Sequence, residues 1–530
     1  MKENISIFFI PLFLSFSLVS CENKTKTGIG EASKKKPNII YILADDLGYG
    51  ELGAYGQDKI ETPNLDALAE NGMVFSQHYS GAPVCAPARF MLLTGKHAGN
   101  AYIRGNDEWS ERGKVWDYKE VIKDSTLEGQ RPIPDSISFF PEKLQEIGYA
   151  TGMNGKWGLG APHTNSIPNK KGFDFFYGYN CQRQAHTYYP VHLYRNENRV
   201  YLNNDTIAPD RELAPGADPN NSESYVDYTL QDYAPDLMFD EMIGWISEQK
   251  DNPFFFYWAS PIPHNPIQAP QKWVNYYKKK FGAEEPYLGS KGYFPNQFPR
   301  AAYAAQISYL DENVGKLVKY LKENNLYQNT LIMFTSDNGV TYTGGTDGSF
   351  FNSSGEFGEE YGKAKGFLYE GGIRVPMIVS WPNKIKPGSK TDLISAQYDV
   401  LATLSEITKF EKPSDTDGIS FLPTLLQNEE AQKEHEFLFW EYPEYGGQVA
   451  IRMGEWKVVR QNLKNKKRPT LELYNLVKDP QEKNNVASEY PKIIEKATKI
   501  FKKEHSDAQI ERFRIPQVEN GLLENNEKPS

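Results

Sequence analysis

The stretch PNIIYILADDLG, residues 37–48, decides the expected fold, because a run of apolar residues is followed at once by two acids. The run from Ile39 to Leu43 has the length and composition of a strand buried on both faces of a sheet. The segment TPNLDALAENG follows, with Thr62 as a helix N-cap, a proline in the first turn and Gly72 as a stop. A buried strand followed by a helix predicts an α/β fold.

The same alternation of strands and helices recurs along the chain. The pattern predicts a helix that ends at Gly148, a strand over Phe254 to Trp258 and a long amphipathic helix over Tyr303 to Leu321. The runs TLIMFTSDNG and VPMIVSWP add two more buried strands. We therefore expect a mostly parallel sheet flanked by helices.

After about Tyr398 the strands become shorter. EFLFWEY, QVAIRMGEWKVVR and LELYNLV have the pattern of an antiparallel sheet. We expect a larger domain over residues 37–398 and a smaller C-terminal α+β subdomain over residues 399–520.

The N-terminus has the features of an export signal. Lys2 and an apolar run that ends at Val19 precede Cys21, and a polar stretch follows. Residues 1–20 are predicted to be a signal peptide and residues 21–36 a tether, with Cys21 lipidated as in a bacterial lipoprotein. The alternative is an ordinary cleaved signal with an incidental cysteine. We expect an exported protein in the periplasm or at the cell surface of a bacterium, attached to the membrane only through a lipid.

Charge and cysteine content exclude some classes of protein. The formal net charge of −10, without a basic stripe, argues against a nucleic-acid partner. Besides Cys21 the chain has only Cys85 and Cys181, so it is not a disulfide-stapled fold, although a bond between these two stays open.

Acidic and amide side chains follow two of the predicted strands. Asp45 and Asp46 come directly after the first strand, and Asp337 and Asn338 after a later one. Each pair taken alone is more often a helix cap or a turn. Carboxyl ends of strands in an open α/β sheet meet at one edge, where three carboxylates would repel one another without a cation. Oxygen ligands of this kind suit Ca²⁺ or Mg²⁺.

The segment GAPVCAPARFMLLTG, residues 81–95, places Cys85 between two prolines. Cys85 could be a small buried apolar residue. If Pro87 opens a helix, however, Arg89 lies one turn from Cys85 on the same face, where an anion is favoured. Three more residues could face a ligand, two lysines in glycine-flanked loops and a histidine after a strand: Lys156, Lys365 and His264.

These residues resemble the formylglycine-dependent (type I) sulfatase family of the alkaline phosphatase superfamily. CAPAR followed by TG is similar to its signature Cys-x-Pro-Ser-Arg leading into Thr-Gly. The resemblance runs from about Pro37 to Val486, through the leading Asp-Asp, the Gly-Lys-Trp loop, the Pro-His-x-Pro turn and the Asp-Asn-Gly strand end. It implies an alkaline-phosphatase-like fold and a sulfuric ester hydrolase.

The resemblance also implies a cofactor and a role for each residue. Cys85 would be oxidised to formylglycine by a formylglycine-generating enzyme during maturation. One Ca²⁺, ahead of Mg²⁺, would be held by that residue and by Asp45, Asp46, Asp337 and Asn338. Arg89, Lys156 and Lys365 would balance charge on the sulfuryl oxygens, and His264 would protonate the departing alcohol.

Two positions depart from the family pattern. Ala88 stands where most members have serine, which leaves modification of Cys85 expected. Gly158 stands where many have a histidine that contacts the formylglycine hydroxyl. His163 and His186 are weak candidates to replace it, because a lone histidine is more often structural.

The expected substrate is a sulfated saccharide. The segment from His97 to Trp109 could line the sugar subsite, with Arg104 and Asn106 reaching hydroxyls, or could be an ordinary surface loop. Two alternatives to a sulfatase stay open: a phosphate ester or phosphonate hydrolase of the same superfamily, and a lipoprotein that binds sulfated glycans without turnover.

Overall fold

The apolar run of the first strand becomes the centre of a large sheet. In this computed structural model β1 (Asn38–Asp45) is fully buried and lies parallel to β8 on one side and β9 on the other, with Ile39 opposite Phe255 and Leu331. The ten strands run in the order β11-β2-β10-β9-β1-β8-β4-β5-β6-β7. The five from β9 to β5 are parallel, which confirms the mostly parallel sheet. The strands besides β1 are β2 (Met73–Phe75), β4 (Ala150–Lys156), β5 (Phe175–Tyr179), β6 (His192–Arg195), β7 (Asn198–Tyr201), β8 (Phe254–Pro263), β9 (Thr330–Ser336), β10 (Met377–Ser380) and β11 (Ser389–Thr391).

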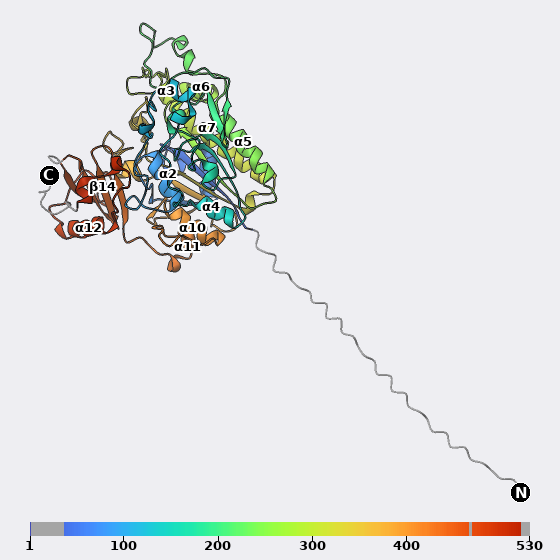
Figure 1. Ribbon diagram of the computed structural model, residues 1–530, viewed down its shortest axis with the longest axis vertical. Helices are drawn as coiled ribbons and strands as arrows, with labels where there is room; N and C mark the ends of the chain where they lie inside the picture. Colours follow the sequence, from blue (N-terminus) through green and yellow to red (C-terminus); the bar gives the residue numbers. More distant parts are fainter. Residues whose placement is uncertain (2–35, 466–468, 521–530) are drawn as a thin grey trace. The chain divides into compact units, whose positions relative to one another are not determined.

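Helices cover both faces of this sheet, because successive residues of a strand point to opposite faces. Tyr41 and Leu43 pack in one apolar cluster with residues of α2, α4 and α10, whereas Ile40 and Ile42 pack in another with α1, α5 and α7. Figure 1 shows α5 and α7 beside each other along the sheet. The helices of this part are α1 (Pro63–Glu70), α2 (Cys85–Thr94), α3 (Tyr118–Lys123), α4 (Phe140–Glu146), α5 (Ala234–Glu248), α6 (Gln271–Phe281), α7 (Pro299–Glu323), α8 (Gly348–Phe351), α9 (Glu370–Ile373), α10 (Asp399–Thr408) and α11 (Leu422–Leu425).

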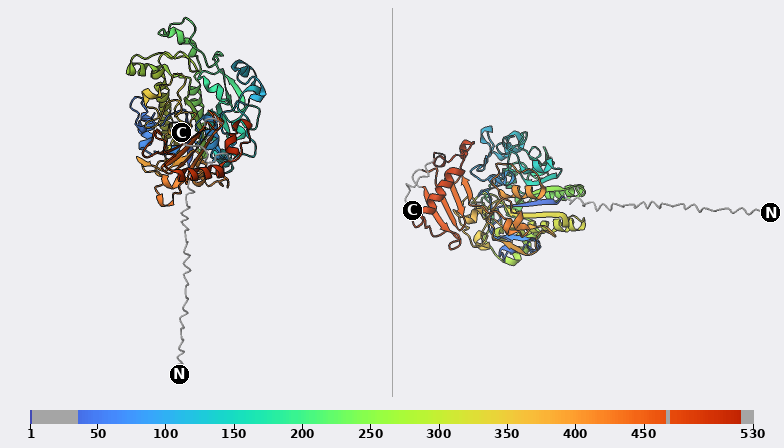
Figure 2. Two further views of the ribbon diagram at one scale, coloured as in Figure 1. Left: turned by 90° about the vertical axis from the view of Figure 1, so that its left-hand side faces the viewer. Right: turned by 90° about the horizontal axis from the view of Figure 1, so that it is seen from below.

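The second sheet is antiparallel, as the sequence predicts. Its order is β13-β14-β15-β16, and Figure 2 shows these strands side by side. The run QVAIRMGEWKVVR forms two strands rather than one, because the chain turns at Gly454, whose φ of +57° suits glycine. The elements are β13 (Leu438–Tyr442), β14 (Gln448–Met453), β15 (Trp456–Gln461), β16 (Thr470–Asn475), α12 (Pro491–Glu504) and α13 (Pro516–Glu519).

A third apolar cluster joins this sheet to the rest of the molecule. Trp440 and Tyr442 of β13 pack in it with Tyr79 of the two-residue strand β3 (His78–Tyr79), which pairs with β12 (Ser395–Ala396). The indole of Trp440 donates a hydrogen bond to the Ser80 carbonyl at 2.8 Å. The boundary expected after Tyr398 stays a prediction.

The structure describes Met1, residues 36–465 and residues 469–520. The predicted signal peptide beyond Met1, Cys21 and all of the tether except Lys36 lie outside the described residues. Within the described part, no helix has the length and apolar character needed to cross a bilayer. Cys85 and Cys181 are both buried and free, so they do not form the disulfide that the sequence left open.

Candidate active site

The predicted site residues meet at the carboxyl edge of the large sheet. Asp45 ends β1, Lys156 ends β4, His264 follows β8 and Asp337 follows β9. These four strands are neighbours in the sheet, so their ends are brought together. Cys85 reaches the same place from the first position of α2, and its thiol donates to Asp45 Oδ1 at 3.2 Å.

Arg89 lies one turn from Cys85, as expected, but the helix begins two residues earlier than Pro87. Val84 is extended and precedes the first turn, so Cys85 itself has helical geometry. The Arg89 guanidinium bridges two carboxylates, with Nη2 2.9 Å from Asp337 Oδ2 and 3.2 Å from Asp45 Oδ2. Arg89 is fully buried and therefore needs these partners.

Two lysines complete the charge balance around Cys85. Lys156 Nζ is 2.6 Å from Asp45 Oδ2, and Lys365 Nζ is 2.6 Å from Asp46 Oδ1. Lys365 also lies 3.8 Å from the sulfur of Cys85. The cluster thus contains three carboxylates and three permanent cations, and an anionic substrate group would find the cations already in place.

The oxygen atoms of the cluster fit a divalent cation. Asn338 donates from Nδ2 to Asp46 Oδ1 at 2.8 Å, while its own carbonyl oxygen Oδ1 is buried without a partner among the described residues. Ligand atoms of Asp45, Asp46, Cys85 and His264 all lie within 4.8 Å of one another. Burial and the charge of Asp45 raise the pKa of Asp337 to about 7. This crowding of negative charge is what a bound cation would relieve.

The thiol of Cys85 is not an activated nucleophile. Burial and the adjacent Asp45 carboxylate raise the pKa of Cys85 well above its usual value, so the thiol stays protonated. Burial alone would raise the pKa of Asp45 as well, but the charges of Lys156 and Arg89 hold it below the usual range. Unmodified Cys85 therefore lacks the thiolate that cysteine hydrolases use.

His264 is fixed with one nitrogen toward the cluster. Its Nδ1 lies 2.6 Å from the Asn265 carbonyl oxygen, and Nε2 lies 3.7 Å from Asp46 Oδ2. Its ring stacks on His186 at 5.4 Å and meets the edge of Tyr293 at 5.8 Å. Burial and the charge of Lys365 lower the pKa of His264. The sequence analysis missed Tyr293, which follows Gly292 in a loop and has no signal of its own.

Of the two histidines proposed to replace one at position 158, one lies beside the cluster and the other does not. His186 stacks on His264, which puts it beside the cluster. His163 is exposed and hydrogen-bonds to Ser125 at 2.8 Å, so it does not join the cluster.

The space beside Gly158 is occupied by a glutamine that the sequence did not reveal. A Cβ at position 158 would lie 2.6 Å from Cγ of Gln182, and the φ of +71° also disfavours a larger residue. Gln182 Nε2 donates to Asn106 Oδ1 at 3.1 Å, and that oxygen also accepts from the Ala86 amide at 3.3 Å. Asn106 thus contacts the backbone next to Cys85.

Arg104 does not reach a sugar subsite, so that interpretation was wrong. It is buried and paired with Glu441 at 2.8 Å, and it donates to the Gly99 and Ala101 carbonyls at 2.9 Å each. A buried guanidinium requires such a counter-ion. Because Glu441 lies 337 residues away in the chain, no local sequence pattern could reveal this pair.

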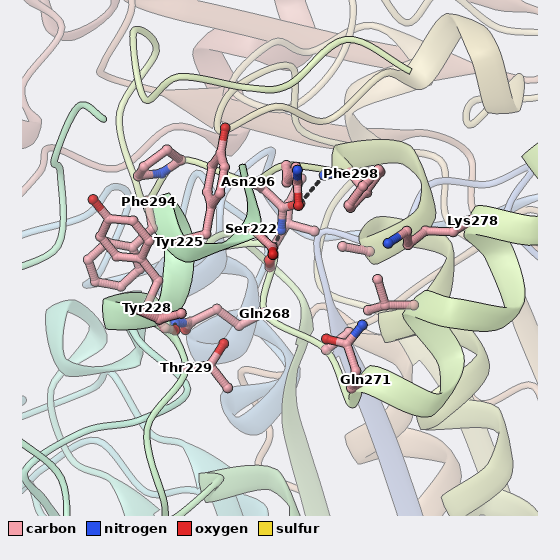
Figure 3. Close-up of a pocket in the computed structure, with 17 residues that line it drawn as sticks. Ser222, Tyr225, Tyr228, Thr229, Gln268, Gln271, Lys278, Phe294, Asn296 and Phe298 are labelled. Carbon is pink, nitrogen blue, oxygen red and sulfur yellow. Dashed lines mark hydrogen bonds between the residues drawn. The ribbon is translucent and has the colours of Figure 1, made fainter. Parts of the chain in front are cut away.

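A separate pocket of about 450 Å³ lies farther along the loop that carries His264. Figure 3 shows Tyr225, Tyr228 and Phe294 on one side of it and Lys278 on the other. None of the predicted catalytic or metal-binding residues lines it. The candidate active site is therefore the charged cluster around Cys85, which is separate from this pocket.

Comparison with known proteins agrees with this geometry. Residues 37–410 match the family described as Sulfatase, and residues 356–508 match the one described as N-sulphoglucosamine sulphohydrolase, C-terminal. Human N-acetylgalactosamine-6-sulfatase is 30% identical over 427 residues, which cover 76% of this chain and 68% of that protein. The N-acetylgalactosamine-6-O-sulfatase of Bacteroides thetaiotaomicron is 28% identical over 549 residues, covering 93% and 98%.

A solved structure shares the fold over most of both chains. The crystal structure of Ps i-CgsB is 25% identical and covers 92% of this chain and 97% of its own, with a TM-score of 0.68. A second structure of Ps i-CgsB, in complex with k-i-k-neocarrahexaose, has the same similarity. The chain therefore belongs to the sulfatase family and is a sulfuric ester hydrolase of the alkaline-phosphatase-like fold.

Proposed function

We propose that this sulfatase removes sulfate from a saccharide, using a formylglycine formed from Cys85 and one bound Ca²⁺. The observation that carries the proposal is the place of Cys85, a protonated and unreactive thiol at the centre of three carboxylates and three cations. Formylglycine at this position would supply, as its hydrate, the hydroxyl nucleophile that the buried thiol cannot. A formylglycine-generating enzyme is then a partner during maturation.

Asp45, Asp46, Asp337 and Asn338 would hold the cation. Their oxygens are hard ligands, and Asn338 Oδ1 adds one that has no hydrogen-bond partner among the described residues. When bound, the cation lowers the pKa of an oxygen nucleophile beside it. Ca²⁺ is preferred to Mg²⁺ because several carboxylate oxygens converge, and elemental analysis of the purified protein tests this choice.

The chain's own cations orient the sulfate group. Lys156, Lys365 and Arg89 are fixed by ion pairs on the sides of Cys85, so their charges are in place before the substrate arrives. Preorganised charge of this kind favours the transition state, in which charge on the sulfuryl oxygens shifts. His264 presents Nε2 to the cluster while Nδ1 contacts a carbonyl, so Nε2 is the atom that would carry the proton to the leaving alcohol.

A saccharide substrate is supported by the names of the relatives. Two of them are N-acetylgalactosamine-6-sulfatases, and Ps i-CgsB has been solved with a neocarrahexaose. Export and a lipid anchor at Cys21, as the N-terminal sequence predicts, would place the enzyme in the periplasm or at the cell surface of a bacterium, where polysaccharide fragments arrive.

The test compares two buried cysteines. Cys85→Ala should abolish sulfate release with folding intact, and Cys85→Ser should complete at most one slow turnover, because serine has one hydroxyl where a hydrated aldehyde has two. Cys181→Ala is the matched control, since Cys181 is equally buried and free, and it should keep both turnover and the mass change from thiol to aldehyde. The substrates are N-acetylgalactosamine 6-sulfate, sulfated carrageenan oligosaccharides and nitrophenyl sulfate.

Two results would contradict the proposal. Sustained turnover by Cys85→Ser would rule out the formylglycine mechanism. A wild-type protein that binds the saccharides but releases sulfate from none of them would instead be the glycan-binding lipoprotein that the sequence left open. Nitrophenyl phosphate assayed in parallel measures any phosphatase activity.

A further inference from the structure

Four aromatic side chains contact one another in a chain that reaches the surface, with Tyr361 and Tyr445 exposed, Tyr342 half-buried and Phe367 buried beneath them. The ring centroids of Tyr342 and Tyr361 are 5.0 Å apart, those of Tyr361 and Phe367 5.2 Å, and those of Phe367 and Tyr445 5.3 Å. We name these four residues the aromatic ledge. Tyr361 and Tyr445 are 68% and 48% exposed, which is high for large rings that contact other rings.

The aromatic ledge begins where the catalytic cluster reaches solvent. Lys365 lies between Tyr361 and Phe367 in the sequence, and its side chain is 17% exposed, more than any other charged group paired in the cluster. A Cβ at Gly366 would be 3.2 Å from the ring of Tyr445, so this ring lies directly on the backbone next to Lys365. The same Lys365 reaches within 3.8 Å of the Cys85 sulfur.

The backbone conformation of Tyr445 and the exposure of the rings are both energetically unfavourable. Tyr445 is in the turn between β13 and β14 and has a φ of +47°, which is unfavourable for a bulky residue. Exposing aromatic surface is unfavourable as well. Because Tyr445 comes from the second sheet and Tyr361 from a loop of the first part, two separate segments place exposed rings against Phe367, two residues from Lys365.

We propose that the aromatic ledge binds the pyranose ring that neighbours the sulfated sugar in an oligosaccharide. The apolar C–H face of a pyranose matches an aromatic face, and the tyrosine hydroxyls can bind the sugar's own hydroxyls at its edge. The sulfated sugar would occupy the charged cluster, and its neighbour would extend past Lys365 across the exposed rings of Tyr361 and Tyr445. This inference rests on the proposed saccharide substrate, and it gives the second sheet a role in substrate recognition.

The experiment measures kcat/KM for two substrates with the same terminal sulfated sugar, N-acetylgalactosamine 6-sulfate and an oligosaccharide that ends in it. Tyr361→Ala and Tyr445→Ala should each lower kcat/KM for the oligosaccharide by about tenfold, the value of one aromatic stacking contact. The monosaccharide should change by less than about twofold, since it does not reach the ledge. Tyr361→Phe should keep most of the oligosaccharide activity.

Tyr201→Ala is the control for exposed aromatic surface. Tyr201 is 67% exposed, like Tyr361, but lies on the edge strand β7. Its replacement should leave both substrates unchanged. Equal losses on both substrates, or no loss on the oligosaccharide, would overturn the aromatic ledge as a sugar site.

A binding measurement separates this inference from the proposed function. The Cys85→Ala protein, with and without Tyr361→Ala, is titrated calorimetrically with the same oligosaccharide and with a carrageenan oligosaccharide. If the wild type releases sulfate only from nitrophenyl sulfate, the proposal that the substrate is a saccharide is wrong. Weaker oligosaccharide binding after Tyr361→Ala would then still support the ledge, and unchanged or absent binding would reject it.

Discussion

His264 is the residue that we propose as the general acid for the leaving group. The carbonyl of Asn265 lies at hydrogen-bond distance from Nδ1, and the stacked ring of His186 fixes the plane of the imidazole. Only Nε2 is then free to face the cluster, 3.7 Å from Asp46. With glycine at position 158, no second histidine of the family pattern shares this task.

Replacement of His264 should therefore distinguish substrates by their leaving group. A sugar alkoxide is a poor leaving group and needs a proton in the transition state, whereas nitrophenolate does not. His264→Ala should slow hydrolysis of a sulfated sugar by roughly 10² to 10⁴, the usual contribution of one general acid, and slow nitrophenyl sulfate distinctly less. The measurement is kcat/KM for both substrates in one preparation.

His163→Ala serves as the control, because His163 is exposed and bonds only to Ser125 among the contacts described. Damage such as metal loss would slow both substrates of His264→Ala alike. Equal factors for the two substrates would thus show that His264 binds sulfate or holds structure.

At this scale the sequence predicted residues that follow buried strands and missed those fixed by distant partners. The sequence could predict that three residues lie close together, because the carboxyl ends of parallel strands share one edge of the sheet: Asp45, Asp337 and His264. Gln182 could not, since its contact with Gly158 depends on how a short 3₁₀ segment packs. Arg104 was misread for the same reason, as its counter-ion is on the second sheet.

Among the elements, those with strong apolar periodicity were predictable. The buried strands β1, β8 and β9 and the long helix α7 occur where their patterns indicate. The strands β6 and β7 at one end of the sheet were not predicted, because each has only four residues and β7, the edge strand, has no buried residue to give an apolar signal. The segment Gln182–His186, which precedes β6, was likewise not assigned a structure from the sequence.

The loop segment that follows α2 contains a buried glutamate, Glu108, whose pKa is raised. Glu108 accepts hydrogen bonds from Gln130 Nε2 at 3.0 Å and from the Cys181 thiol at 3.5 Å. Burial raises the pKa of Glu108 from its usual 4.5 to about 7. The folded protein thus holds this proton more tightly than the unfolded chain, so the stabilising effect of Glu108 is full below pH 4.5 and is lost as the pH rises through 7.

Glu108→Gln should remove this part of the pH dependence. Between pH 5 and pH 8 the unfolding free energy of the wild type should fall by on the order of 1–3 kcal/mol more than that of the variant, because the variant has no titrating side chain at position 108. Urea unfolding at the two pH values measures the difference. Glu248→Gln, at an exposed position of α5, should behave as the wild type, and a Glu108→Gln profile parallel to the wild type would contradict the assignment.

At the scale of the molecule, a buried ionic group joins the two sheets. Lys457 of β15 has no exposed side-chain surface and contacts Glu370 of α9 and Glu482, each at 2.9 Å. Glu370 also accepts from Tyr79 at 2.6 Å and pairs with Arg374 at 3.1 Å. Despite its burial, the charges of Lys457 and Arg374 lower the pKa of Glu370 to about 2. The segment from Lys365 to Arg374 thus connects the charged cluster around Cys85 to the second sheet.

Removal of the central cation should therefore destabilise the described part as a whole. Lys457→Met keeps the packing volume but leaves two carboxylates facing one another in the interior, and breaking such a buried pair costs about 3–5 kcal/mol. We expect one lowered denaturation midpoint with sulfatase activity lost in the same transition, because Lys365 and Glu370 belong to one segment. Lys499→Met, at an exposed pair with Glu495 on α12, should leave the midpoint unchanged. Two separate transitions, with activity surviving the first, would instead show that the second sheet unfolds independently of the catalytic cluster.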